Sequence, residues 1–135
     1  MSLITKIFGN NENNSIKGGK SADIIYGNAG KDTVALGGGA DTYVYSYGDD
    51  FIQDYTAGQD KIKLDGNTIT GSKLSGSNVI LQTYGGSITV KNGKNKKITV
   101  VDTDGNETSK VYPIDDMPKG LSLKNNVLTW KNILA

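Results

Sequence analysis

Apolar residues recur every nine positions along the first third of the chain, and an acidic or amide residue stands two places before each of them. Written in nines from Gly9 without a gap, the chain gives the units GNNENNSIK (9–17), GGKSADIIY (18–26), GNAGKDTVA (27–35), LGGGADTYV (36–44) and YSYGDDFIQ (45–53). The eighth places hold Ile16, Ile25, Val34, Tyr43 and Ile52. A short apolar-centred stretch followed by six turn-forming residues predicts one short strand and one reversal per unit.

Two such units close one flattened coil, so residues eighteen positions apart should stack in successive coils. Their strands would pair in parallel about 4.8 Å apart, with a right-handed wind. We therefore expect an all-β fold, a right-handed parallel β-roll with two nonapeptides per coil. Its core should consist of two walls of stacked side chains: Ile16, Val34 and Ile52 on one side, and Ile7, Ile25 and Tyr43 on the other.

The sixth place of each unit carries an acid or its amide, in the order Asn14, Asp23, Asp32, Asp41 and Asp50. The eighteen-residue spacing places Asp23 over Asp41, Asp32 over Asp50, and Asn14 over Asp32. Carboxylates about 5 Å apart repel each other by roughly 1–3 kcal/mol per pair. Without a cation, the coil would therefore oppose its own closure.

Residues 54–64 (DYTAGQDKIKL) continue the pattern imperfectly. Gly58, Asp60 and Ile62 repeat the core of the unit, displaced by one inserted residue. A bulged last half-coil would produce this displacement and would bring Asp60 to Asp41.

Composition narrows the choice of cation. The chain of 135 residues, enough for one domain, contains no Cys, no His and no Arg, so only oxygen ligands remain, and these suit hard cations. With 36% hydrophobic residues and 18 glycines, something beyond apolar burial should help to stabilise the fold. Residues 1–60 hold four Lys against eight acids, a net charge of −4, whereas residues 61–135 hold eleven Lys against six acids, a net charge of +5. The acidity thus lies where the repeats lie.

The units at 18–44 resemble the calcium-binding nonapeptide G-G-x-G-x-D-x-U-x of RTX (repeats-in-toxin) proteins, and those at 9–17 and 45–53 resemble diverged edge copies. Residues 54–64 resemble the segment that closes such a block. The resemblance implies a secreted bacterial protein exported by type I secretion, disordered in the calcium-poor cytosol and folded in extracellular calcium. No N-terminal segment reads as a cleavable signal peptide, so export would use a different route.

Calcium between stacked turns would take a carboxylate from each turn and complete six to eight oxygen ligands with backbone carbonyls. Glycine permits the positive φ that lets carbonyls converge, and Asn28 is the next most tolerant residue type. One Gly-Asp cluster alone would indicate an ordinary loop, but five in register favour calcium. Asp49 and Asp54 could be surface charges or accessory ligands. The predicted ligand residues are Asn14, Gly18, Gly19, Ser21, Asp23, Gly27, Asn28, Gly30, Asp32, Gly37, Gly39, Asp41, Gly48, Asp50, Asp54 and Asp60.

Beyond residue 64, β-branched runs alternate with turn signals, which predicts an antiparallel β cap over the last rung of the roll. The predicted strands are 67–70, 78–83, 87–91, 97–101 and 107–112. The predicted regions are the roll at 4–63, the cap at 64–112, and a C-terminal strand or tail at 113–135. Residues 117–135 resemble either the lead-in to a further repeat block or an export tail, and Trp130 reads as a packing residue.

Other functions are weaker matches to the sequence. The Lys-rich stretch 91–97 reads as a hairpin tip, or as a contact for a polyanion or membrane surface, and the lack of Arg argues against nucleic acid. The acids around residues 102–107 read as a turn. With no His or Cys to act as base or nucleophile, no enzymatic activity is expected.

A polysaccharide-binding or adhesive module of a larger secreted protein is the alternative class, and the chain would then be a monomeric fragment that contacts a cell surface. Exposed aromatic residues would favour it. The candidate residues are Tyr26, Tyr43, Tyr45, Tyr47 and Tyr55. In the nine-residue register Tyr43 points inward, and the other four tyrosines do not form one column.

Overall fold

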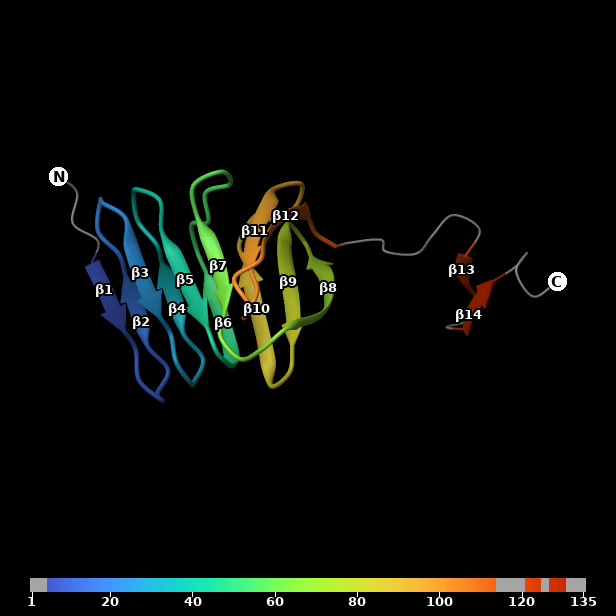
Figure 1. Cartoon of the computed structure of the whole chain (residues 1–135), viewed down its shortest axis with the longest axis horizontal. Helices are drawn as coiled ribbons and strands as arrows, with labels where there is room; N and C mark the ends of the chain where they lie inside the picture. Colours follow the sequence, from blue (N-terminus) through green and yellow to red (C-terminus); the bar gives the residue numbers. More distant parts are fainter. Residues whose placement is uncertain (1–4, 114–120, 125–126, 131–135) are drawn as a thin grey trace.

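The computed structural model of the chain describes residues 5–113, 121–124 and 127–130, and of these the side chains of residues 6–113. The described residues form an all-β fold with two six-stranded sheets and one separate hairpin (Figure 1). Within the described ranges, no helix is long and apolar enough to cross a membrane. The first sheet has the order β1 (Thr5–Phe8), β3 (Asp23–Tyr26), β5 (Thr42–Tyr45), β7 (Lys61–Leu64), β11 (Lys97–Val101) and β12 (Glu107–Val111). The second has the order β2 (Ser15–Lys17), β4 (Thr33–Ala35), β6 (Gly48–Ile52), β10 (Gly86–Val90), β9 (Asn78–Thr83) and β8 (Ile69–Ser75).

Strands β1 to β7 form a parallel β-roll in which the chain passes from one sheet to the other at each turn. Ile25 pairs with Tyr43 in the first sheet, and Ile16 pairs with Val34 in the second, each eighteen residues apart. The prediction of two nonapeptides per coil is therefore confirmed. The inserted residue is confirmed as well, because Tyr43 pairs with Ile62, nineteen residues on.

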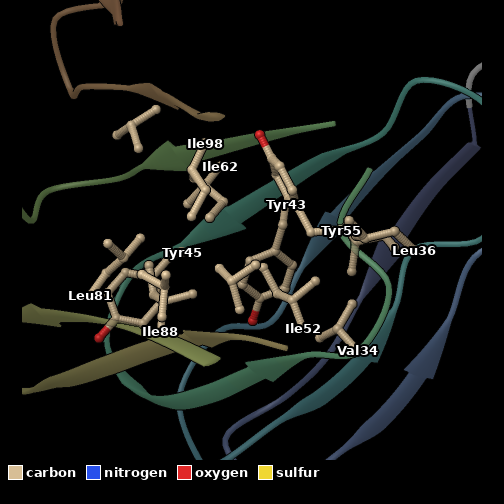
Figure 2. Packing of buried hydrophobic residues seen from close by; sticks show 14 of the residues in the cluster. Val34, Leu36, Tyr43, Tyr45, Ile52, Tyr55, Ile62, Leu81, Ile88 and Ile98 are labelled. Carbon is tan, nitrogen blue, oxygen red and sulfur yellow. The ribbon is translucent and has the colours of Figure 1, made fainter. Parts of the chain in front are cut away.

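The eighth-place side chains fill the space between the two sheets (Figure 2). Ile25, Val34, Tyr43 and Ile52 are fully buried, and Ile7 packs partly exposed against the same cluster. Because side chains alternate along a strand, the residue on each side of the eighth place points away from this core. The two predicted walls are confirmed.

The second half of the chain continues both sheets of the roll. As predicted, the neighbours β8–β9, β9–β10 and β11–β12 are antiparallel. The strands that join the roll are parallel to it, however, since β10 pairs with β6 and β11 pairs with β7. Leu81, Ile88 and Ile98 belong to the same apolar cluster as the roll, so cap and roll share one core.

Predicted strand positions in this half are close to the observed ones, with one displacement. The strand expected at 67–70 spans Ile69–Ser75 and has a bulge between Ile69 and Gly71. It lies at the edge of its sheet and is mostly exposed, so its second part lacks the apolar alternation that marks a strand in the sequence.

The C-terminal hairpin consists of β13 (Leu121–Lys124) and β14 (Val127–Trp130). Most of the predicted tail at 117–135 lies outside the described residues, and so does the predicted packing of the Trp130 side chain.

Candidate metal centre

The sixth-place residues form two columns, each along one side of the roll. The first column consists of Asn14, Asp32 and Asp50, and the second of Asp23, Asp41 and Asp60. In each column the Oδ1 atom of an aspartate accepts a hydrogen bond from the backbone N–H of the sixth-place residue one coil earlier. The N···O distances are 2.8 Å for Asn14–Asp32 and for Asp23–Asp41, 3.1 Å for Asp32–Asp50 and 3.0 Å for Asp41–Asp60. The predicted stacking, including the displaced Asp60, is confirmed.

These carboxylates are buried without a cationic partner. Asp32 is 0% exposed, Asp41 is 1% exposed, and the other three aspartates of the columns are 1–3% exposed. The one ion pair within the described part of the chain joins Lys61 Nζ to Glu107 Oε1 at 2.6 Å, and it involves none of the columns. Burying an ionised carboxylate is costly unless it is paired, so each column needs positive charge from elsewhere.

Burial and mutual repulsion shift the acidity of the columns. Burial, together with the charges of Asp60, Asp23 and Asp54, raises the pKa of Asp41 to about 6 against the opposing hydrogen bond from the Asp23 backbone. Burial likewise raises the pKa of Asp50 to about 7, against the opposing hydrogen bonds from the Tyr43 hydroxyl and the Asp32 backbone. The pKa values of Asp32 and Asp60 are also raised, chiefly by burial. Without a bound cation, the folded protein therefore disfavours the ionised form of these carboxylates.

Two buried oxygens, Asp32 Oδ2 and Asp41 Oδ2, have no hydrogen-bond partner. The equivalent oxygens of the other acids are satisfied. Asp23 Oδ2 accepts from Gly19 N at 2.8 Å, Asp60 Oδ2 accepts from Thr56 N at 2.8 Å, and Asp50 Oδ2 accepts from the Tyr43 hydroxyl at 2.5 Å. An unsatisfied, buried, anionic oxygen in the middle of each column is the atom that a hard cation would bind.

The turns before Asp32 and Asp41 contain the left-handed backbone that was predicted to let carbonyl oxygens converge. Positive φ angles occur at Asn28 (60°), Gly30 (93°), Gly37 (83°) and Gly39 (77°). The prediction that Asn28 would tolerate this conformation is confirmed. Gly48, at the start of β6, also has a positive φ of 102°.

The expectation of positive φ is wrong for the first-place glycines, which are needed for close approach instead. A Cβ on Gly18 would lie 2.7 Å from Asp23 Oδ2 and would collide with the Leu36 carbonyl oxygen. A Cβ on Gly27 would lie 2.9 Å from Asp32 Oδ2 and would collide with the Tyr43 hydroxyl.

The remaining predicted residues differ in what they contact. Gly19 has neither a positive φ nor a close neighbour, and it contributes its N–H to Asp23. Ser21 packs closely against the turn one coil later, because a Cβ on Gly39 would lie 2.7 Å from the Ser21 carbonyl carbon. Asp54 accepts two backbone N–H groups, from Leu36 at 2.6 Å and Gly37 at 3.0 Å.

Asp49 is exposed and accepts a hydrogen bond from Ser87 Oγ at 3.2 Å. Nowhere in the described part of the chain do three or more His, Cys, Asp or Glu side chains gather around one point. A cation at Asp32 or Asp41 would therefore depend on main-chain oxygens, as the nonapeptide pattern predicts.

Sequence reasoning missed two contacts. It placed Tyr43 in the core but did not predict that its hydroxyl would reach Asp50. A buried tyrosine at a place otherwise held by Ile or Val is the available signal, because a buried phenol normally needs a partner. It also left open whether Asp54 is a surface charge, and nothing local in the sequence indicates its bonds to residues one coil earlier.

The fold and the stacked acidic turns define a parallel β-roll with two columns of buried carboxylates. Residues 8–43 match the family model of the RTX calcium-binding nonapeptide repeat, in four copies. This stretch is therefore a block of RTX repeats, and such repeats bind Ca²⁺. No curated protein matches the chain.

Proposed function

We propose that this chain is a calcium-gated folding module of a secreted bacterial protein, disordered where calcium is scarce and folded where it is millimolar. The observation that supports this best is the pair of buried, unpartnered oxygens, Asp32 Oδ2 and Asp41 Oδ2. Bound calcium would supply the positive charge that the columns lack. As an export route, type I secretion agrees with the repeat family but rests on that likeness alone.

In this proposal Asp32 and Asp41 hold the two principal calcium ions. Each turn orients its main-chain oxygens through residues of positive φ, Asn28 and Gly30 in one turn and Gly37 and Gly39 in the other. Asp50, Asp60 and Asp23 stand above or below them and contribute the facing charges. Asn14 brings no charge, so a site there would be the weakest.

Affinity should match that of other extracellular calcium modules, with dissociation constants of about 10⁻⁴–10⁻³ M. Stacked turns share aspartates between successive coils, so binding at one turn should assist binding at the next. No catalytic role is proposed, because the chain has no His or Cys and its buried acids are engaged in the columns.

Calorimetric titration of the whole chain with calcium tests the proposal, with magnesium as the control. Calcium should bind at two principal sites, whereas magnesium should not replace it, because magnesium requires a tighter octahedral site and loses water reluctantly. The absence of any calcium heat up to 10 mM at neutral pH would contradict the proposal.

A second candidate function is binding of a polysaccharide on the outer side of the second sheet. Tyr45 and Tyr55 are buried, so they cannot belong to an exposed aromatic face. A groove of about 360 Å³ is present there, with hydroxyl, amide and charged groups around an aromatic ring and a branched apolar side chain. It is lined by Lys31, Asp49, Asp50, Phe51, Ser75, Asn78, Ile80, Ser87 and Thr89.

Such a groove offers a ring face for a sugar and polar groups for its hydroxyls. Titration of the calcium-loaded protein with soluble neutral and anionic polysaccharides tests this function. Phe51→Ala should remove the binding, whereas Tyr84→Ala, at an exposed tyrosine outside the groove, should leave it unchanged. No binding by the wild-type protein would rule it out.

A further inference from the structure

Three of the turns cap their own sixth-place side chain. In these self-capped turns, the N–H four residues before the sixth-place residue donates to its side chain. Asn10 N donates to Asn14 Oδ1 at 2.9 Å, and the Gly19–Asp23 and Thr56–Asp60 bonds are both 2.8 Å long. An acid in a self-capped turn already has one oxygen occupied.

The turns 27–32 and 36–41 are not self-capped. Their acids, Asp32 and Asp41, keep one oxygen without a donor. Their second-place residues, Asn28 and Gly37, have positive φ, which the equivalent residues of the self-capped turns do not. The turn 45–50 is not self-capped either, but there the Tyr43 hydroxyl donates to Asp50 Oδ2, and Ser46 has no positive φ. An acid oxygen without a donor and a left-handed second-place residue therefore occur together in the turns 27–32 and 36–41.

In the turn 36–41 the structure shows where the capping N–H goes. Gly37 N, the equivalent of Gly19 N one coil earlier, donates to Asp54 Oδ2 at 3.0 Å, and Leu36 N donates to Asp54 Oδ1 at 2.6 Å. Asp54 follows β6 and lies eighteen residues beyond Leu36, so the roll itself brings the two together. Each oxygen of Asp54 is thereby engaged with the backbone.

We propose that Asp54 is a positioning residue that prevents self-capping of the turn 36–41 and keeps Asp41 Oδ2 free for calcium. This inference rests on the proposed function. A carboxylate suits the task, because two N–H groups need two acceptor oxygens. An asparagine offers one acceptor and one donor.

Asp54→Asn in the whole chain tests the inference, with Asp49→Asn as the matched control because it removes one exposed carboxylate from the same roll. In Asp54→Asn, Gly37 N loses its acceptor and can turn to Asp41, as Gly19 N does to Asp23. Loss of such supporting groups lowers metal affinity by about 10–100-fold. Calorimetry should therefore show one calcium site weakened at least about tenfold in Asp54→Asn and unchanged affinities in Asp49→Asn.

Amide hydrogen exchange of Gly37, followed by NMR in saturating calcium, separates positioning from direct ligation. The Gly37 amide should change its exchange rate and chemical shift in Asp54→Asn but not in Asp49→Asn. Loss of a calcium site with an unchanged Gly37 amide would make Asp54 a ligand and would overturn the inference. Equal calcium affinities in the two variants would also overturn it.

If Asp54→Asn does not fold, Asp54→Glu replaces it, because glutamate keeps the charge and both oxygens but moves them by one methylene. Weaker calcium binding at unchanged charge supports the inference, and unchanged binding contradicts it. The wild-type titration reports separately on the proposed function. If the wild-type chain binds no calcium, the proposed function and the inference about Asp54 are both wrong.

Discussion

At the scale of single residues, the acidic turns combine a buried charge with backbone that approaches it closely. The period of nine made the columns predictable, since it fixes which acids stack, and the tolerance of Asn28 for positive φ followed from its residue type. The Tyr43–Asp50 bond and the two N–H groups bound by Asp54 do not follow from the period of nine. They depend on side-chain reach across the core and between coils, which the period does not encode.

Asp32→Asn and Asp41→Asn should each remove one calcium site, whereas Asn14→Ala and Asp49→Asn should keep the calcium stoichiometry. At calcium ten times the dissociation constant, each lost site should lower the free energy of unfolding by about 1.4 kcal/mol. Without calcium the order should reverse, because Asp32→Asn and Asp41→Asn each remove a buried charge that has no cationic partner. Calorimetry and thermal unfolding of the four variants check this. Equal stoichiometry in all four would mean that the columns are not the calcium sites.

At the scale of elements, each sheet runs without interruption from the roll into the cap. The strands of the cap were predictable from β-branched runs and turn signals, and so were their antiparallel hairpin partners. The parallel strand pairs β6–β10 and β7–β11 were not predictable, because they connect residues 38 positions apart. Long-range pairing of this kind depends on which strand ends the roll, not on local sequence.

Ile88→Ala in β10 should therefore weaken calcium-dependent folding of the roll, although it lies outside the repeats. Ile88 is fully buried in the shared core, and truncation of such a residue lowers the free energy of unfolding by about 2–5 kcal/mol. The calcium midpoint of folding should rise. Val111→Ala, at a side chain that is 46% exposed, is the control. An unchanged midpoint for Ile88→Ala would show that cap and roll fold independently.

At the scale of the whole molecule, calcium and protons should compete for the same buried carboxylates. The folded-state pKa values of Asp41 and Asp50, about 6 and about 7, lie above their ordinary value of 3.8. Between these values the folded state holds more protons than the unfolded state, so metal-free stability should fall as pH rises from about 4 to 7. Calcium competes with those protons, and its affinity should rise over the same range.

Thermal unfolding in metal-depleted buffer at pH 5 and pH 7.5 checks this dependence. Without calcium, the chain should retain more β structure and a clearer thermal transition at pH 5 than at pH 7.5, where it should be largely disordered. The stabilisation by saturating calcium should therefore be larger at pH 7.5. If the metal-free protein is as stable at pH 7.5 as at pH 5, ionisation of the column carboxylates does not destabilise the fold, and the account is contradicted.

The most direct measurement of calcium-gated folding is far-ultraviolet circular dichroism of the whole chain during calcium titration. In excess chelator at neutral pH the chain should be largely disordered, and millimolar calcium should restore β structure, whereas equal magnesium should not. A chain that is equally rich in β structure and equally heat-stable in excess chelator would contradict calcium-gated folding.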